Sequence, residues 1–261
     1  ATMISLLLIP LLTSIALVLI HVYFGSFVLK RGVIFIDLAL AQWAALGYLV
    51  GHFLGVHNPY GLFFIGFSFT VIASVFLTIL RPYYKKSNFQ EAVIGVMYIM
   101  AITFATALVS ISGMEGYHIN EMLAGHLLFI QPSELIIAIC LYLVIGGSLF
   151  WLHPYLSRQL SAKWNFIFYV LFGLVVTSSV KMVGVLLVFS YLVLPLLVVN
   201  LFIKRLKIQL KWAWITGVFC SLLGLMGSVM LDVPPSYCII LSLCTFWASA
   251  ILFKAIRPKL R

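Results

Sequence analysis

Residues 31 to 47 read Arg31-Gly-Val-Ile-Phe-Ile-Asp37-Leu-Ala-Leu-Ala-Gln42-Trp-Ala-Ala-Leu-Gly47. A basic residue opens the run, and an apolar stretch follows in which Asp37 and Gln42 are the only strongly polar side chains. An ionisable group inside an apolar span is costly, so by default it marks a functional position. The run predicts an embedded helix with a candidate functional carboxylate near its start.

The composition is that of a polytopic membrane protein. Of 261 residues, 64% are hydrophobic and 8% are charged, and the mean hydropathy is +1.19. Such a chain has almost no soluble part, so we expect an all-α fold with a single transmembrane domain over residues 1–261. The four cysteines lie in apolar stretches without the spacing of a zinc or redox site, which indicates ordinary apolar packing.

Polar breaks divide the chain into stretches long enough to cross about 30 Å of hydrocarbon at about 1.5 Å per residue. They predict nine transmembrane helices, the sixth of them short, over roughly residues 3–27, 34–56, 60–80, 90–111, 132–152, 164–180, 182–203, 211–231 and 235–256. Residues 112–131, between the fourth and fifth spans, are too polar at their start and too short after it to cross alone. We expect them to form a re-entrant or interfacial outer segment.

The lysines and arginines predict the orientation. Fifteen of the sixteen fall in alternate loops, all on one side of the predicted spans, and only Lys181 falls on the other side. The positive-inside rule makes the basic side cytoplasmic, which places the N-terminus outside and the C-terminus inside. The net charge of +10 is therefore a topology signal and does not indicate a nucleic-acid partner.

Four runs carry a resemblance to a known family. In chain order they are the opening run, Glu91-Ala-Val-Ile-Gly-Val-Met-Tyr98, His118-Ile-Asn-Glu-Met-Leu-Ala-Gly125, and Ser178-Ser-Val-Lys-Met-Val-Gly-Val-Leu-Leu-Val-Phe-Ser-Tyr-Leu-Val-Leu-Pro195. Together with the topology they resemble the membrane permease subunit of bacterial ATP-binding-cassette (ABC) importers for zinc, manganese or iron(II). The resembling runs extend from about residue 30 to 203, and the topology extends the resemblance to the whole chain.

The resemblance implies a multi-pass permease of the bacterial inner membrane, paired as a homodimer or with a related permease. It implies a path for a divalent metal along the subunit interface, a cytoplasmic ATPase subunit and an extracytoplasmic metal-binding protein as partners. The metal is then the transported substrate, and the chain itself binds no cofactor. No Gly-x-x-x-x-Gly-Lys-Ser/Thr motif occurs in the sequence, so we expect ATP to bind and be hydrolysed in the separate subunit, and this chain not to be an enzyme.

The inner loop over residues 153–164 is the candidate for ATPase coupling. It resembles the coupling helix of the family in position, although it lacks the acidic residues often found there. Its apolar side chains would form one face over a helical turn or two. The apolar face would consist of Tyr155, Leu156, Leu160 and Trp164, and the four residues predicted to contact the ATPase are Tyr155, Leu156, Arg158 and Leu160. The alternative is an ordinary amphipathic turn at the membrane interface.

The metal path departs from the family pattern. Many such permeases carry an Asp and, four residues later, a His in the second span, both facing the pore. If Asp37 takes the acid position, Ala41 stands at the histidine position. If the run is aligned on the glycine instead, Gln42 replaces the histidine and Leu38 the acid. Neither alignment keeps both ligands, so the chain resembles a divergent member.

Asp37 and Gln42 each have a structural and a functional interpretation. Asp37 either caps its helix, pairs with Arg31 or meets a basic residue of another span, or it contacts the ion as a ligand or gate. Gln42 is five residues further on and points about 140° away, so the two would not share an ion on a regular helix. Gln42 forms either an interhelical hydrogen bond or a contact in the path.

A second candidate metal site lies in the outer segment. His118 and Glu121 are three residues apart, and His126 follows on nearly the same face of a helix. Imidazole and carboxylate groups suit a first contact with Zn²⁺, Mn²⁺ or Fe²⁺, and loose ligands at a pore mouth let the ion move on. The alternative is a solvated loop with ordinary polar residues.

Two other classes of protein remain as alternatives to the importer. A proton-coupled secondary transporter would use Asp37 and would need no ATPase. An intramembrane enzyme would need a nucleophile or a tight metal cluster, and the sequence shows neither a Ser/His pair in register nor His-Glu-x-x-His.

Overall fold

A computed structural model describes residues 3–84, 89–112, 125–157 and 162–256. Within these ranges the chain is helical and has no strand. The elements are α1 (Met3–Arg31), α2 (Ile36–Phe53), α3 (Pro59–Tyr84), α4 (Gln90–Ser112), the 3-10 turn η1 (Leu127–Phe129), α6 (Pro132–Ser157), α7 (Ala162–Val183), α8 (Val185–Asn200), α9 (Leu206–Leu231) and α10 (Pro235–Ile256).

The nine long helices of the described ranges coincide with the nine predicted spans, which confirms the all-α, polytopic expectation. Seven of them are long and apolar enough to cross a membrane. The other two are α2 and α8, which are the shortest. The helix ends differ from the prediction in places, because α2 stops at Phe53 and α6 continues to Ser157, into the predicted coupling loop.

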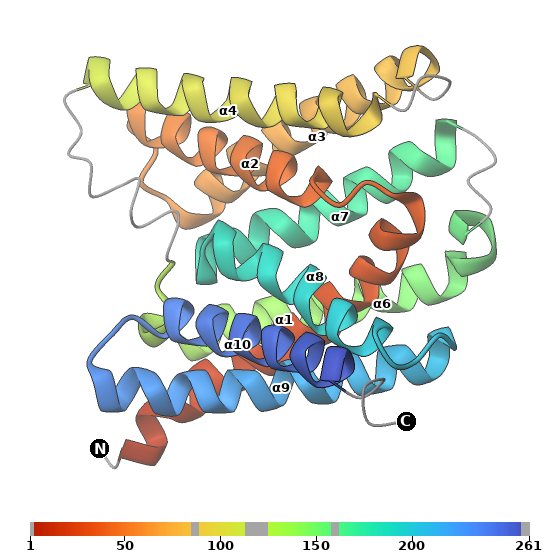
Figure 1. Cartoon of the computed structure of the whole chain (residues 1–261). Coiled ribbons are helices and arrows are strands. Elements are labelled where there is room, and N and C mark those ends of the chain that lie inside the picture. The colour runs from red at the N-terminus through yellow and green to blue at the C-terminus, as the bar shows by residue number, and fades with distance from the viewer. Residues whose placement is uncertain (1–2, 85–88, 113–124, 158–161, 257–261) are drawn as a thin grey trace.

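Successive helices run in opposite directions, and Figure 1 shows α2, α3 and α4 on one side with α1, α9 and α10 on the other. Between them lie α7 and α8, which contact both groups. In α2, 14 of 18 residues are buried, and in α8 11 of 16. These two short helices are therefore interior helices that are covered mainly by protein.

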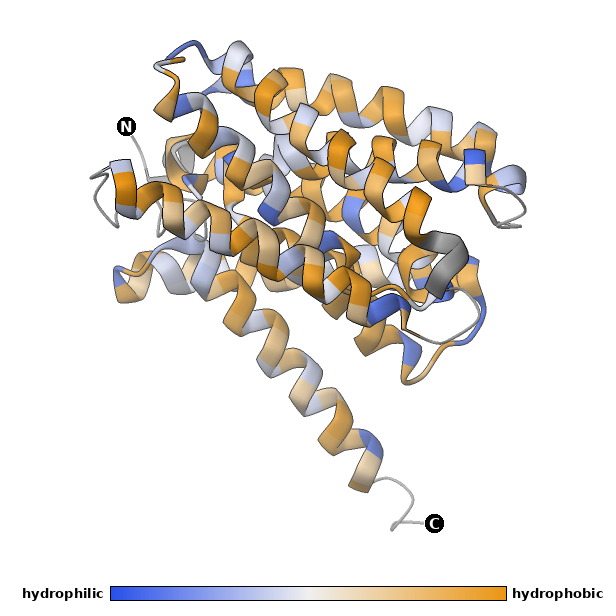
Figure 2. Cartoon of the chain, turned by 90° about the horizontal axis from the view of Figure 1, so that it is seen from above, coloured by the Kyte–Doolittle hydropathy of each residue, from blue (hydrophilic) through white to orange (hydrophobic). Residues whose placement is uncertain are grey.

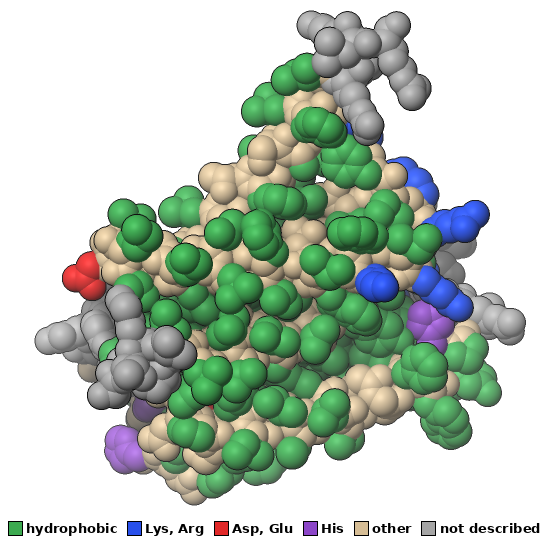
Figure 3. All heavy atoms as spheres, turned by 90° about the horizontal axis from the view of Figure 1, so that it is seen from below, with side chains coloured by type: hydrophobic (Ala, Val, Ile, Leu, Met, Phe, Trp, Pro, Cys, Tyr) green, Lys and Arg blue, Asp and Glu red, His purple; other side chains and the backbone are tan. Residues whose placement is uncertain are grey.

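The outer surface of the bundle is apolar, as a lipid-facing surface must be. Figure 2 shows the hydrophobic residues spread around the helices, and α10 leaves the bundle so that residues 251–256 are exposed. Charged residues lie at the helix ends. Figure 3 shows lysines and arginines at one end of the molecule and an acidic residue at the opposite end. Lys204 and Lys254 belong to the basic end, and Lys181 with Glu134 to the other.

The junction of α1 and α2 is built by a Schellman motif. Gly32 has a φ of +66°, and its N–H donates to the carbonyl of Leu29 while Val33 N–H donates to the carbonyl of Val28, both at 3.3 Å. Glycine takes this left-handed conformation without a steric penalty, and the two bonds satisfy carbonyls at the helix end. The chain therefore turns sharply after Arg31 and enters α2 within four residues.

Small residues set the crossing of α2 and α3: in the sequence Gly47, Gly51 and Gly55 recur every four residues, a spacing that predicts close helix packing. A Cβ at Gly47 would lie 2.7 Å from Gly66 Cα, and one at Gly51 would lie 2.7 Å from a methyl carbon of Leu62. Helices in lipid approach this closely only where side chains are small. Gly55, expected to continue this stripe, instead lies beyond the end of α2 with a φ of +77° and open space around its Cβ position.

Pro195 predicts a bend or break in the seventh span, but the helix break lies eleven residues earlier, at Gly184. This residue has a φ of +80° and separates α7 from α8. Pro195 itself lies within α8, which is assigned as helix from Val185 to Asn200. Gly184 alone therefore joins α7 to α8. Glycine suits this position because it adopts a positive φ without a steric penalty.

Candidate functional site

Asp37 is the second residue of α2 and is completely buried. Neither of its carboxylate oxygens accepts a hydrogen bond from the part of the chain that the structure describes. The residue at the helix N-cap is Phe35, and no side chain caps this helix. The structural roles expected for Asp37, as a cap or as the partner of a basic residue, therefore have no contact that supports them.

Arg31, the expected partner of Asp37, donates elsewhere. Its Nη1 donates to Asn165 Oδ1 at 3.1 Å and its Nη2 donates to the carbonyl of Leu156 at 2.9 Å. The guanidinium carbon also lies 3.9 Å from the centre of the Phe168 ring, in cation–π geometry. These acceptors belong to α6 and α7.

A second carboxylate lies at the same end of the bundle. Glu91 Oε1 accepts the backbone N–H of Ile34 at 2.9 Å, while its Oε2 is buried without a partner. The two helices that carry the acids run parallel, and Trp43 Nε1 donates to the carbonyl of Met97 at 3.1 Å between them. A buried polar atom without a partner costs about 1 to 3 kcal/mol, and a charged one costs more. This end of α2 and α4 therefore holds carboxyl oxygens that have no partner among the described residues, and such oxygens can serve as ligands for a cation.

Gln42 is buried, with 4% of its surface exposed. Because α2 is an unbroken helix from Ile36 to Phe53, Gln42 and Asp37 leave it about 140° apart. Ala41 is buried at the position four residues after Asp37. Within the described ranges, no group of three or more His, Cys, Asp or Glu residues is arranged to hold a metal ion. Asp37 is therefore not part of a multi-ligand metal site among the residues that the structure describes.

The predicted outer site is described only in part. His118 and Glu121 lie outside the described residues. The His126 backbone N–H donates to the carbonyl of Met182 at 3.0 Å, which fixes the segment against the end of α7. A Cβ on Gly125 would lie 2.1 Å from the carbonyl carbon of Val183. The three-residue outer site remains a prediction, although the backbone at His126 is now located.

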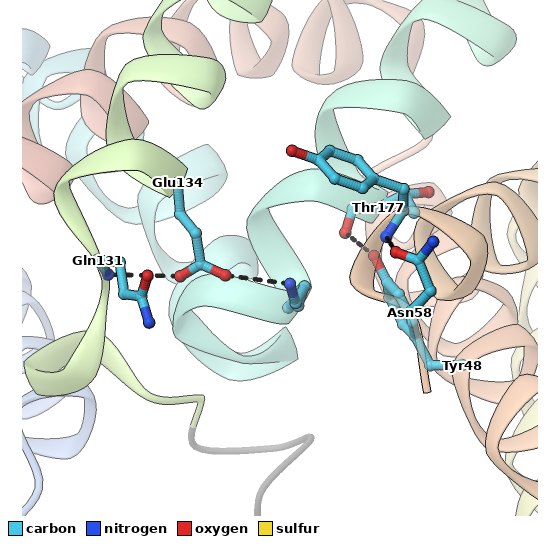
Figure 4. A network of polar contacts seen from close by, with 7 residues as sticks. Tyr48, Asn58, Gln131, Glu134 and Thr177 are labelled. Atoms are coloured by element: carbon cyan, nitrogen blue, oxygen red, sulfur yellow. Dashed lines mark hydrogen bonds and ion pairs between the residues drawn. The ribbon is translucent and has the colours of Figure 1, made fainter. Parts of the chain in front are cut away.

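Polar contacts near the same end connect α6, α7 and α2 (Figure 4). Lys181 Nζ lies 3.1 Å from Glu134 Oε1, and the backbone N–H of Gln131 lies 3.4 Å from Glu134 Oε2. Tyr48 OH donates to the carbonyl of Thr177 at 2.9 Å. The lone basic residue of this side is thus neutralised by an acid on the neighbouring helix.

Sequence reasoning missed the hydroxyl cluster on α7. Tyr142 OH lies 2.9 Å from Ser179 Oγ, and Ser178 Oγ donates to the same phenol at 3.2 Å. The oxygens of Thr70 and Thr177 lie 3.4 Å apart. The signal was three consecutive hydroxyl residues in an apolar helix. Their contacts reach α3 and α6, so this part of α7 is the polar centre of the bundle.

The ends of α6 and α7 frame the candidate coupling loop. Tyr155 is 54% exposed and stacks on Trp164, with ring centroids 4.9 Å apart and planes at 18°. Leu156 is completely buried and does not share the exposed face with Tyr155. Arg158 and Leu160 lie outside the described residues. Of the four residues named for contact with an ATPase, Tyr155 is therefore the one that the structure shows at the surface.

Comparison with known proteins gives consistent matches. The model of the ABC 3 transport family matches residues 3–254. The high-affinity zinc uptake system membrane protein ZnuB of Haemophilus influenzae is 28% identical over 85% of this chain and 86% of its own length. The manganese import system permease ScaB of Streptococcus gordonii is 26% identical over 96% and 91%. PsaBC of Streptococcus pneumoniae, solved with a Fab, shares the fold with a TM-score of 0.76 at 19% identity over 94% and 90%.

Proposed function

The chain belongs to the ABC 3 transport family, and from this premise we propose that it is the membrane subunit of an ATP-driven importer that carries a divalent transition metal across the bacterial inner membrane. The family match over residues 3–254 carries this proposal. Relatives named for zinc and manganese uptake, each covering most of both chains, support the substrate class. The all-helical, multi-pass fold supplies the scaffold that such a subunit needs.

The proposed orientation places the basic end of the bundle in the cytoplasm. Lys204 and Lys254 lie at that end, at the C-termini of α8 and α10, and Lys181 at the other is paired with Glu134. Positive charge is retained on the cytoplasmic side of bacterial membranes. Asp37 is then near the cytoplasmic end of the path, and the segment around His126 is at the outer end.

Asp37 is proposed as an ion contact at a gate. Both its oxygens are unsatisfied, and the structural partners expected for it are absent among the described residues. In this conformation Asp37 and Gln42 are enclosed by protein, so an ion reaches them only when α2 shifts against its neighbours. Such a rearrangement fits a transporter that alternates between closed and open states.

The partners follow from the same proposal. The sequence contains no Gly-x-x-x-x-Gly-Lys-Ser/Thr motif, so ATP is hydrolysed in a separate cytoplasmic subunit. That subunit is proposed to press on the α6–α7 loop, where Tyr155 is exposed beside it. An extracytoplasmic metal-binding protein delivers the ion to the other end, and a second permease chain, the same or related, completes the path.

Reconstitution tests the proposal directly. The chain is purified with its ATPase subunit, placed in vesicles and offered Zn²⁺, Mn²⁺ and Fe²⁺ separately, with the binding protein, and the internal metal is measured by elemental analysis. We expect uptake of at least one metal that requires ATP. Uptake by the chain alone, driven by a proton gradient, would instead establish the secondary transporter that uses Asp37. No uptake of any of the three metals would contradict a metal importer.

The outer site has its own test. We expect the double change His118→Ala with Glu121→Ala to lower uptake about tenfold at limiting metal, because first-contact ligands set the local capture of the ion. Asn120→Ala, between the two positions, is the matched control and should transport normally. Equal uptake by the double variant and the control would show that these side chains are ordinary loop residues.

A further inference from the structure

Arg31 holds both ends of the α6–α7 connection. Leu156 is in the last turn of α6, where helix carbonyls have no partner within the helix, and its carbonyl accepts from Arg31 Nη2 at 2.9 Å. Asn165 is in the first turn of α7, and its side-chain oxygen accepts from Arg31 Nη1 at 3.1 Å. The Arg31 guanidinium therefore links the last turn of α6 to the first turn of α7, on the two sides of the loop.

Packing around this guanidinium makes the connection stiff. The Phe168 ring lies under the guanidinium carbon at 3.9 Å, and Phe27 on α1 packs on Phe168 with centroids 5.9 Å apart. Across the loop, the ring of Tyr155 stacks on that of Trp164. The ends of α6 and α7 are thus held to each other by the two rings and to α1 by Arg31.

The same residue begins the path to Asp37. Arg31 is the last residue of α1, and the Schellman bonds of Gly32 and Val33 fix the turn that follows. The Ile34 N–H bond to Glu91 fastens that turn to α4. Asp37 comes three residues later, in the first turn of α2. A displacement of Arg31 therefore moves the hydrogen-bonded turn over residues 32–35 and, with it, the first turn of α2, where Asp37 lies.

We propose that Arg31 is the positioning residue that transmits movement of the α6–α7 loop to the α1–α2 connection and so to Asp37. The inference rests on the proposed function, in which an ATPase moves this loop. Arginine suits the role because its planar fork reaches two acceptors at once while its face stacks on a ring. A lysine ammonium at the same place is a single point charge and cannot reproduce this geometry.

The test compares metal transported per ATP hydrolysed in the reconstituted complex. We expect Arg31→Lys and Asn165→Ala each to lower this ratio about fivefold, a size typical of coupling between sites. ATPase assembly and basal hydrolysis should stay unchanged. Because the two residues share one interaction, the double variant should lose less than the product of the single losses. Lys30→Gln, a polar change at the exposed residue next to Arg31, is the control and should keep the wild-type ratio.

The amount of metal transported per ATP hydrolysed separates a loss of transmission from a loss of stability. A variant that only folds less well yields fewer complexes, but each complex still transports normally per ATP. Wild-type ratios in both Arg31→Lys and Asn165→Ala would overturn the inference, as would an equal loss in Lys30→Gln. If Arg31→Lys does not assemble, Asn165→Ala, which keeps the guanidinium and its Leu156 contact, decides the question alone. Absence of ATP-dependent uptake in the wild-type complex would instead refute the proposed function.

Discussion

Asp37 is buried with two oxygens that have no partner among the described residues, although none of the thirteen other buried residues of the same helix carries a carboxylate or a basic group. Such a group lowers the stability of the fold, since its solvation in water is lost and nothing replaces it. Proteins retain costs of this kind mainly where function requires them. The residue is thus better explained by transport than by packing.

Replacing Asp37 by asparagine should separate stability from function. We expect Asp37→Asn to unfold at a higher temperature, because a neutral amide costs less to bury, and to lower metal uptake about tenfold through loss of the ligand charge. Thermal unfolding of the detergent-solubilised protein and vesicle uptake measure the two effects. Asp232→Asn makes the same change at an exposed position and should alter neither. Lower membrane abundance with normal uptake per molecule would restore a structural role for Asp37.

At the scale of elements, backbone contact decides which helices pack together. The α2–α3 crossing depends on glycine, and the sequence showed this through the four-residue spacing of Gly47 and Gly51. Spacing alone did not show that Gly55 lies in a turn. In uniformly apolar helices the pattern also does not tell which face meets protein and which meets lipid, since both environments accept the same side chains.

The close α2–α3 crossing predicts how a methyl group added at Gly47 changes the stability of the fold. Gly47→Ala places a Cβ 2.7 Å from Gly66 Cα, so the helices must separate and stability should fall by about 1 to 3 kcal/mol. Gly95→Ala, in the second turn of α4, meets no atom within 4 Å and should be neutral or slightly stabilising. Chemical unfolding in mixed micelles measures the difference. Equal stabilities would mean that the α2–α3 contact is looser than this crossing requires.

The close contact of Gly125 with the α7–α8 turn gives a second prediction about packing. Gly125→Ala adds a backbone penalty at a φ of +64° and a clash 2.1 Å from the Val183 carbonyl carbon. Gly55→Ala adds a similar penalty at a φ of +77° with no atom near the new methyl group. We expect a clearly larger fall in thermal unfolding temperature for Gly125→Ala. A matching fall in both variants would attribute the whole effect to backbone strain.

At the scale of the whole molecule, charge is divided between two ends. Lys204 in the α8–α9 connection, the lysines of α9 and Lys254 of α10 lie at one end, while at the other Lys181 is offset by Glu134 and accompanied by Asp232. Interior α2 and α8 connect the two ends, with Asp37 near the basic one. Under the proposed function and orientation, this division gives the chain one end for a cytoplasmic ATPase and the opposite end for an external binding protein.

Labelling of single cysteines tests this orientation. In a variant without native cysteines, Asp232→Cys should react with a membrane-impermeant maleimide in intact cells, because it lies at the outer end. Lys254→Cys should react only after the cells are permeabilised. Both positions are exposed in the structure, so access depends on the side of the membrane and not on burial. Reaction of Lys254→Cys in intact cells would reverse the proposed orientation.

The sequence by itself determined the class of the protein, the number and order of its long helices, the one-sided basic charge and the family resemblance. These properties follow from local composition and spacing, because the hydrophobic length of a segment and the position of its basic residues decide how it inserts into a bilayer. Only the tertiary structure decided that Arg31 bonds to Asn165 and Leu156 while Asp37 is left unsatisfied. It also buried Leu156 and exposed Tyr155. Such choices depend on which distant helices meet, since a buried polar group takes the partner that packing brings within reach.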